Sequence, residues 1–316
     1  MHLPVWMRSP VLRLYIWAFS CTLEEAACTD LRTYPNLGEF FRRQLKRGVR
    51  PVHTSHCMVS PADGRILQHG VVTPKGIEQV KGVTYSLKGF LGPLDGLLPA
   101  HVPSTETVER LKRVSSLHLM TDEAHLKPKS VDIDPLTSSD DLSYLRRLLV
   151  HPENVLHYCI IYLAPGDYHR YHSPADWTVF ARRHFPGELY SVSPGVARWL
   201  QGLFNFNERA VYTGSWRYGF FSMTPVGATN VGSINVYFDE DLTTNKESHE
   251  AGTYFDESFF SKNTASPGLK IHKGQAVGDF NLGSTIVLMF EAPANFRFQQ
   301  KIGQKVKVGQ SLGTLI

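Results

Sequence analysis

The hydrophobic pattern of this chain changes from helical spacing near the N-terminus to the short apolar runs typical of strands. The segment 9–21, SPVLRLYIWAFSC, is aliphatic and aromatic and carries one charge, Arg13. It predicts a helix, which could lie in a membrane interface or pack as a buried helix on the domain. It is too short to span a bilayer, and the sequence contains no uninterrupted apolar run of the length that spanning requires.

A second helix is predicted over 36–51, NLGEFFRRQLKRGVRP. Apolar residues recur at helical spacing with basic residues between them, and Gly48 and Pro51 are typical of a helix end. The basic face could contact acidic lipid headgroups, although such faces are more often simply solvated.

From residue 58 the pattern predicts mainly strands. Residues 58–91 are short β-rich pieces separated by turns, 155–165 is a buried strand, and 211–238 alternates β-branched and aromatic residues with glycines. Residues 193–204 predict a short capped helix. Residues 92–150 are rich in Ser, Thr, Asp, Lys and Pro, with one weak helical patch, and indicate an insertion or a mobile surface loop.

The last segment, 301–316, has short strands and recurring glycine turns similar to those of carrier domains. The predicted fold is therefore a β-rich α+β fold, with barrel-sandwich-like sheets and membrane-proximal helices at the N-terminus. We expect a helical segment over 1–50 and one main domain over 51–316, which contains the variable insertion 92–150.

Composition narrows the class of partner. The 316 residues include 33 basic and 29 acidic side chains, so the net charge of +4 gives no electrostatic reason to expect a nucleic-acid partner. The four cysteines lack the spacing of a zinc ribbon and are too sparse for a disulfide scaffold, so we expect reduced, structural thiols.

The segment 279–293, DFNLGSTIVLMFEAP, places Gly283 and Ser284 before a long hydrophobic run. A serine hydroxyl can attack the carbonyl carbon of the residue before it when the backbone is strained and a base takes the proton, which turns the amide into an ester. Removal of the α-proton of residue 284 and β-elimination would then break the chain and leave dehydroalanine, which hydrolyses to a pyruvoyl group. Alone, Gly-Ser-Thr is common turn chemistry.

Two further segments carry candidate groups. The segment 164–174, APGDYHRYHSP, presents His169 and His172 on the loop after a buried strand. Two imidazoles at this spacing suit proton transfer; they could also bind a metal, but no further ligands are evident, and we expect none. Asp63, in SPADGRI, is either a turn residue or the acceptor that fixes the tautomer of one histidine, whose other nitrogen can then take the serine proton.

Six segments occur together in one order, and they resemble phosphatidylserine decarboxylases of the mitochondrial and bacterial branch that carries LGST at its processing site. The six are SPADGRI, YLAPGDYHRYHSP, HFPGELYSV, NER, VGATNVGSI and FNLGSTIVLMFEAP. The resemblance runs from about Leu12 to the C-terminus, apart from much of 92–150.

The resemblance implies a proenzyme that cuts itself between Gly283 and Ser284. It would give a β chain, 1–283, and an α chain, 284–316, whose first residue is a covalent pyruvoyl cofactor made from Ser284.

Individual roles also follow from the resemblance. Asp63, His172 and Ser284 match the self-processing triad of the family. His169 matches a histidine that acts in decarboxylation, as a proton donor or by orienting the substrate.

The implied reaction is decarboxylation of phosphatidylserine to phosphatidylethanolamine and CO2, through a Schiff base between the pyruvoyl group and the serine amine. The implied partners are phosphatidylserine, a membrane surface and the α/β pair cut from one chain, with a higher homo-oligomer left open. The implied location is the mitochondrial inner membrane. Relatives normally carry a presequence and an upstream transmembrane helix, whereas Met1 here lies close to the matching region, so this location follows from the family alone.

The sequence alone leaves three other interpretations. A carrier domain would need a modifiable lysine at a hairpin tip, where this chain has Gly283 and Ser284. A hydrolase could use Ser284, His172 and Asp63 as an ordinary triad, although the G-x-S-x-G elbow is missing. A processing-defective relative could survive as a lipid-binding protein without cleavage.

Overall fold

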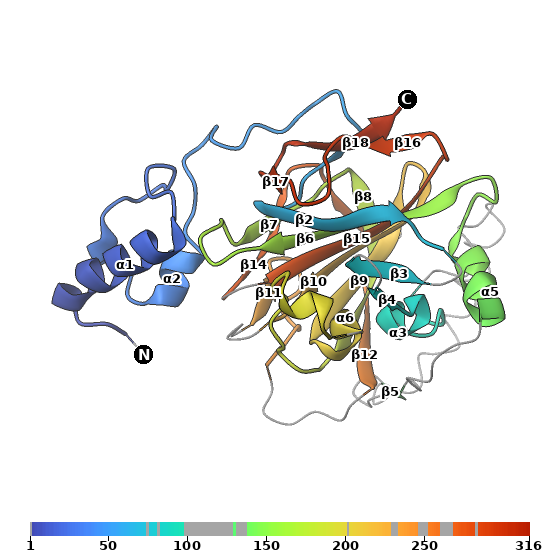
Figure 1. Ribbon diagram of the computed structural model, residues 1–316, viewed down its shortest axis with the longest axis horizontal. Helices are drawn as coiled ribbons and strands as arrows, with labels where there is room; N and C mark the ends of the chain where they lie inside the picture. The colour runs from blue at the N-terminus through green and yellow to red at the C-terminus, as the bar shows by residue number, and fades with distance from the viewer. Residues whose placement is uncertain are drawn as a thin grey trace.

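A ten-stranded antiparallel sheet forms the centre of the protein (Figure 1). The computed structural model describes residues 2–73, 76–80, 83–97, 129–130, 138–200, 202–228, 233–245, 252–259, 268–281 and 284–316. The strand order is β17-β2-β6-β15-β10-β9-β8-β12-β5, and β13 also pairs with β8. These strands are β2 (Gly64–Val71), β5 (Lys129–Ser130), β6 (Val155–Leu163), β8 (Trp177–Phe185), β9 (Arg209–Trp216), β10 (Gly219–Val226), β12 (Thr253–Ser258), β13 (Leu269–Ile271), β15 (Ser284–Ala292) and β17 (Lys305–Val306).

Two small sheets and a hairpin accompany the large sheet. One small sheet has the order β1-β18-β16, the other β11-β14-β7, and β3 pairs with β4. Their bounds are β1 (Met58–Val59), β3 (Ile77–Val80), β4 (Val83–Tyr85), β7 (Arg170–His172), β11 (Ile234–Val236), β14 (Ala276–Phe280), β16 (Phe296–Phe298) and β18 (Ser311–Leu315).

Strand β15 separates two hydrophobic cores. Its even-numbered residues, such as Ile286 and Leu288, join the core shared with the small sheets, and its odd-numbered residues, such as Val287 and Met289, join the core on the other face. All nine residues of β15 are buried, which explains why this run is continuously apolar rather than alternating.

Short helices surround the sheet. Figure 1 shows α1 (Val5–Phe19) and α2 (Leu37–Phe41) at one end of the molecule, beside the turn between β6 and β7. The other helical elements are η1 (Leu31–Thr33), α3 (Leu87–Leu91), α5 (Ser138–Leu148), η3 (Val196–Arg198) and α6 (Leu203–Phe206). Side chains of α3, α5 and α6 fill the second core.

The β-rich α+β prediction is confirmed, as are the strands predicted within 58–91, 155–165, 211–238 and the C-terminal segment. The helix predicted over 36–51 is wrong in length, because α2 ends at Phe41. Beyond it Leu45 forms a β-bridge with Ala26. Arg43 is buried with its guanidinium 4.8 Å from the centre of the Phe40 ring. Tertiary contacts therefore override the helical spacing.

Two other helix predictions need correction. The helix predicted over 193–204 is instead a 3-10 turn, η3, and the separate helix α6, which begins after Gly202 at a φ of +73°. Helix α1 starts four residues before the predicted segment 9–21, and only Leu12 of its side chains is buried.

Most of the predicted insertion 92–150 lies outside the described residues. Its described parts pack into the protein: Leu94 and Leu97 from one end, with Tyr144 and Leu148 of α5 from the other, join the second core. These ends are therefore core elements rather than surface loop. The division of the chain at residue 50 stays a prediction.

Candidate active site

Ser284 is the first residue of β15 and lies opposite Leu163, the last residue of β6. Its side chain is fully buried, and its Oγ has no hydrogen-bond partner within the described part of the chain. The neighbouring Thr285 Oγ1 is in the same state. Buried hydroxyls without partners cost free energy and are uncommon, so this strand end is a candidate site. Gly283, the other predicted cleavage-site residue, lies outside the described residues.

A tight turn leads from β6 to the histidines. The Asp167 carboxylate closes it by accepting a hydrogen bond from the Ala164 amide at 2.8 Å, and burial raises the pKa of this carboxyl above its ordinary value. Gly166 is required here, because a Cβ at this position would lie 1.9 Å from the Phe19 carbonyl oxygen. Helix α1 therefore packs directly on the turn.

His169 lies at the end of this turn and is completely buried. Its Nδ1 lies 2.9 Å from the Asp167 carbonyl oxygen. Because a carbonyl can only accept, Nδ1 carries the proton and Nε2 has the lone pair. Nε2 has no partner among the described residues. Burial lowers the pKa of His169 to about 3, so the ring is neutral at physiological pH.

His172 is the last residue of β7. Its amide donates to the Pro61 carbonyl at 2.7 Å. Its Nδ1 lies 3.0 Å from the Gly274 carbonyl oxygen, and the Tyr168 hydroxyl lies 3.3 Å from its Nε2. Nδ1 is therefore the protonated nitrogen, and Nε2 accepts from Tyr168. Burial lowers the pKa of His172, and the nearby charge of Asp63 opposes that shift only in part.

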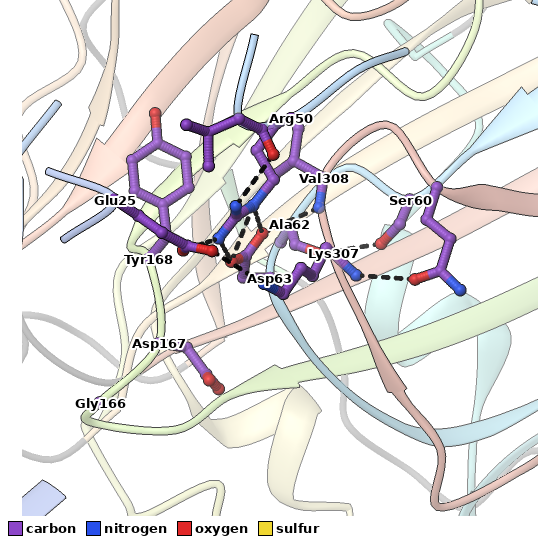
Figure 2. A network of polar contacts seen from close by, with 12 residues as sticks. Glu25, Arg50, Ser60, Ala62, Asp63, Gly166, Asp167, Tyr168, Lys307 and Val308 are labelled. Carbon is purple, nitrogen blue, oxygen red and sulfur yellow. Dashed lines mark hydrogen bonds and ion pairs between the residues drawn. The ribbon is translucent and has the colours of Figure 1, made fainter. Parts of the chain in front are cut away.

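Asp63 is buried and lies at the centre of the network in Figure 2. Arg50 Nε donates to its two carboxylate oxygens at 2.9 and 3.1 Å, Arg50 Nη2 donates to one of them, and the Val308 amide donates at 2.8 Å. Neither nitrogen of His172 contacts this carboxylate in the described structure. The prediction that Asp63 fixes the histidine tautomer is therefore wrong here, because the Gly274 carbonyl does so.

The structure thus brings the predicted residues into one region without joining them. Pro61 links the segment of Asp63 to His172, and Phe280 donates its amide to the His169 carbonyl at 3.1 Å, three residues before the predicted scissile bond. Ser284 Oγ is not hydrogen-bonded to either histidine.

Sequence reasoning missed three residues of this site. Two of them, Arg50 and Phe41, lie in the segment predicted as one long amphipathic helix, whose spacing indicates the contacts of neither. The ring of Phe41 packs on His169, with 4.0 Å between the ring centroids. Tyr168 stands within the recognised motif, but nothing in the spacing distinguishes it from a core tyrosine. Only tertiary contacts identify them.

The described residues contain no group of three or more His, Cys, Asp or Glu side chains placed to hold a metal ion. In the same part of the chain, every helix is too short or too polar to cross a bilayer.

Comparison with known proteins assigns the family. The sequence model of the phosphatidylserine decarboxylase family matches residues 37–314. The chain belongs to this family. Its members are carboxy-lyases, so the predicted enzyme class and decarboxylase activity are confirmed. The match includes all four residues predicted to act in catalysis, whose individual roles stay predictions.

Individual relatives agree. The mitochondrial phosphatidylserine decarboxylase proenzyme of Pongo abelii is 50% identical over 99% of this chain and 68% of its own length. Proenzyme 1 of Schizosaccharomyces pombe is 44% identical over 100% of this chain and 77% of its own length. Proenzyme 1 of Saccharomyces cerevisiae is 41% identical, with coverages of 99% and 69%. All three names specify mitochondria, which confirms the predicted organelle; placement at the inner membrane stays a prediction.

Proposed function

We propose that this chain is a self-processing decarboxylase of phosphatidylserine whose pyruvoyl group is made from Ser284. The observation that carries the proposal is the buried hydroxyl of Ser284 at the start of the central strand, which has no hydrogen-bond partner among the described residues, in a chain that belongs to this family. Its product would be phosphatidylethanolamine.

In the processing step, Ser284 Oγ attacks the carbonyl carbon of Gly283, and His172 Nε2 takes the hydroxyl proton. The C–O bond forms as the C–N bond of the Gly283–Ser284 amide breaks, and the proton passes from His172 to the leaving nitrogen, giving an ester and a free amine. The Gly274 carbonyl keeps the proton on Nδ1, which leaves Nε2 as the base. The Tyr168 hydroxyl, which donates to the same lone pair, must turn away during the transfer.

Chain cleavage follows from loss of the α-proton of residue 284. The Cβ–O bond breaks and Gly283 leaves as a carboxylate, so the β chain ends at residue 283. The dehydroalanine left on the α chain takes up water and releases ammonia, which yields the pyruvoyl terminus. The buried Ser284 site fits such a group, because a small polar terminus there has no competing protein hydrogen bonds within the described residues.

When present, the pyruvoyl group supplies an electron sink for the carbon that loses CO2. His169 would take part in this chemistry as a neutral ring with a buried Nε2 lone pair. A resting pKa of about 3 disfavours a role as a ready proton donor. It supports the alternative role, in which Nε2 accepts a hydrogen bond from the substrate and orients it.

The substrate lies in a membrane, and α1 is suited to reach it. Its exposed residues recur at helical spacing and include Trp6, Leu14 and Trp17, which are 77%, 64% and 79% exposed. Aromatic and aliphatic side chains on one helix face favour the interface of a bilayer. The Tyr15 hydroxyl of the same helix donates to the Pro165 carbonyl at 2.7 Å. A membrane bound by α1 would therefore be held at a fixed distance from the turn between β6 and β7, which leads to the two histidines.

Denaturing electrophoresis with intact-mass measurement tests the proposal. The purified chain should give two fragments, the smaller holding the 316 − 283 = 33 residues of the α chain with a ketone-reactive terminus. Ser284→Ala and His172→Ala should stay whole, whereas His169→Ala should be cleaved but decarboxylate slowly. A wild-type chain that stays whole would contradict the proposal and support the carrier, lipid-binding or hydrolase interpretation instead.

A further inference from the structure

Arg50 joins two carboxylates at the edge of the candidate site. Its Nη2 donates to Glu25 Oε2 at 2.6 Å as well as to Asp63, while Nε spans the two Asp63 oxygens. The side chain of Arg50 is only 9% exposed, and that of Asp63 is 8% exposed. Figure 2 shows the guanidinium between the two acids. This contact is a two-point fork rather than a loose surface pair, so it fixes the direction of the carboxylate.

The C-terminal segment completes the network. Lys307 Nζ donates to Glu25 Oε1 at 2.9 Å, and the Val308 amide donates to Asp63. Glu25, Arg50 and Asp63 belong to the predicted β chain, whereas residues 307 and 308 belong to the predicted α chain. The network therefore connects both sides of the predicted scissile bond.

The backbone carries the effect of this network to the base. Asp63 stands two residues after Pro61, whose carbonyl accepts the amide of His172. Ser60 braces the same short segment, because its hydroxyl donates to the Ala62 carbonyl at 2.8 Å. By holding the Asp63 carboxylate, Arg50 thus fixes the backbone segment 61–63, to which the His172 amide is hydrogen-bonded.

We propose that Arg50 is a positioning residue for self-processing. It orients Asp63, and through the 61–63 backbone it orients His172, without touching the reacting atoms. This inference rests on the proposed function of Asp63 and His172 in processing. It also explains how Asp63 can act although it does not contact the imidazole. Asp63 pairs with the Arg50 cation, and its effect is to position His172 through the backbone.

The test follows cleavage of freshly made full-length chain over time by electrophoresis. Arg50→Ala should slow cleavage by about tenfold or more, the loss of one charged hydrogen-bonded contact. Arg50→Lys keeps the charge but loses the two-point fork, so its cleavage rate should fall between those of the wild type and Arg50→Ala. Arg65→Ala is the matched control, because the exposed Arg65 donates to the Gly303 carbonyl and not to Asp63; it should cleave at the wild-type rate.

Chemical rescue separates positioning from general stability. Added guanidinium ion, kept well below denaturing concentrations, should restore cleavage to the Arg50→Ala precursor, whereas an equal concentration of sodium should not. A structural defect would not respond in this way. If the alanine variant does not fold, as judged by circular dichroism, the lysine variant decides, with slower cleavage expected and wild-type cleavage overturning the proposal.

Three results would overturn it: wild-type cleavage of Arg50→Ala, faster cleavage, which would mean that Arg50 restrains Asp63, or a folded variant that guanidinium does not rescue. Asp63→Asn separates failure of the proposed function from failure of this inference. If Asp63→Asn cleaves normally, the proposed function of Asp63 fails and this inference falls with it. If Asp63→Asn is blocked while Arg50→Ala is normal, only the inference fails.

Discussion

The ring of Phe41 lies 4.0 Å, centroid to centroid, from the ring of His169. Phe41 is 1% exposed and covers one side of the buried imidazole. Two hydrogen bonds join the same N-terminal region to this part of the chain. The Tyr15 hydroxyl donates to the Pro165 carbonyl, and Arg170 Nε donates to the Arg42 carbonyl at 2.7 Å. The first fifty residues therefore form part of the wall of the site, in addition to any contact with a membrane.

Phe41→Leu tests the contact with His169 separately from the other packing of the N-terminal region. We expect normal cleavage, because the ring contacts of Phe41 are with His169 and Tyr15. Decarboxylation should fall by about tenfold as His169 loses its cover and its fixed orientation. Product formation from vesicles that contain phosphatidylserine measures the effect.

Phe40→Leu is the matched control for that variant. Phe40 is equally buried but packs on Tyr15 and Tyr34 rather than on His169. Both variants should lose about 1–2 kcal/mol of stability. Equal losses of activity in the two would contradict a specific role for the Phe41–His169 contact.

Acid should destabilise the precursor through its buried histidines. The pKa of His169 falls from an ordinary 6.5 to about 3 in the folded protein, and that of His157 falls to about 4, in both cases mainly by burial. Between these values and 6.5 the unfolded chain binds protons that the folded chain excludes. Stability is therefore fully present above pH 6.5 and is lost as the pH falls, by about 2 kcal/mol from His169 alone between pH 7 and pH 5.

Urea unfolding of the uncleaved Ser284→Ala chain at the two pH values measures this loss without interference from chain separation. Adding His169→Leu should reduce the loss by about 2 kcal/mol. An unchanged pH dependence in the double variant would show that His169 is not the buried neutral ring described here.

Much of the fold was predictable because its strongest signals are local. The apolar run of β15 and the buried strand β6 were identified, since strands buried on both faces leave long hydrophobic segments. The helix assigned to 36–51 failed because Arg43 and Leu45 follow contacts with distant residues rather than helical spacing.

The candidate site was predictable by residue type but not by geometry. The LGST serine and the two histidines stood out through their chemistry and their motifs. The link of Asp63 to Arg50, rather than to His172, depends on how residues 50, 63 and 308 meet in space. The spacing of residues along a single sequence does not predict these tertiary contacts.

Tyr168→Phe should leave processing nearly intact. The Tyr168 hydroxyl donates to the lone pair of His172 that the serine proton needs, so its removal frees the base while Gly274 still fixes the tautomer. We expect a cleavage rate within about threefold of wild type, followed by electrophoresis. A block as complete as that of His172→Ala would instead make Tyr168 a required member of the proton path.

Cleavage at the predicted bond should not release the α chain. Its first strand, β15, sits between β6 and β10, with nine residue pairs to one and six to the other. The two fragments should therefore elute together in size-exclusion chromatography and separate only in denaturant.

High salt and the variant Lys307→Met test which forces hold that pair. High salt weakens the Lys307–Glu25 ion pair and Lys307→Met removes it. The lysine is 60% exposed, and such a contact contributes about 0–1 kcal/mol. Burial of the nine β15 residues on both faces is far larger and does not depend on ionic strength in this way. The fragments should stay together under either change. Separation in high salt without denaturant would mean that charge, not the buried strand, holds the cleaved protein together.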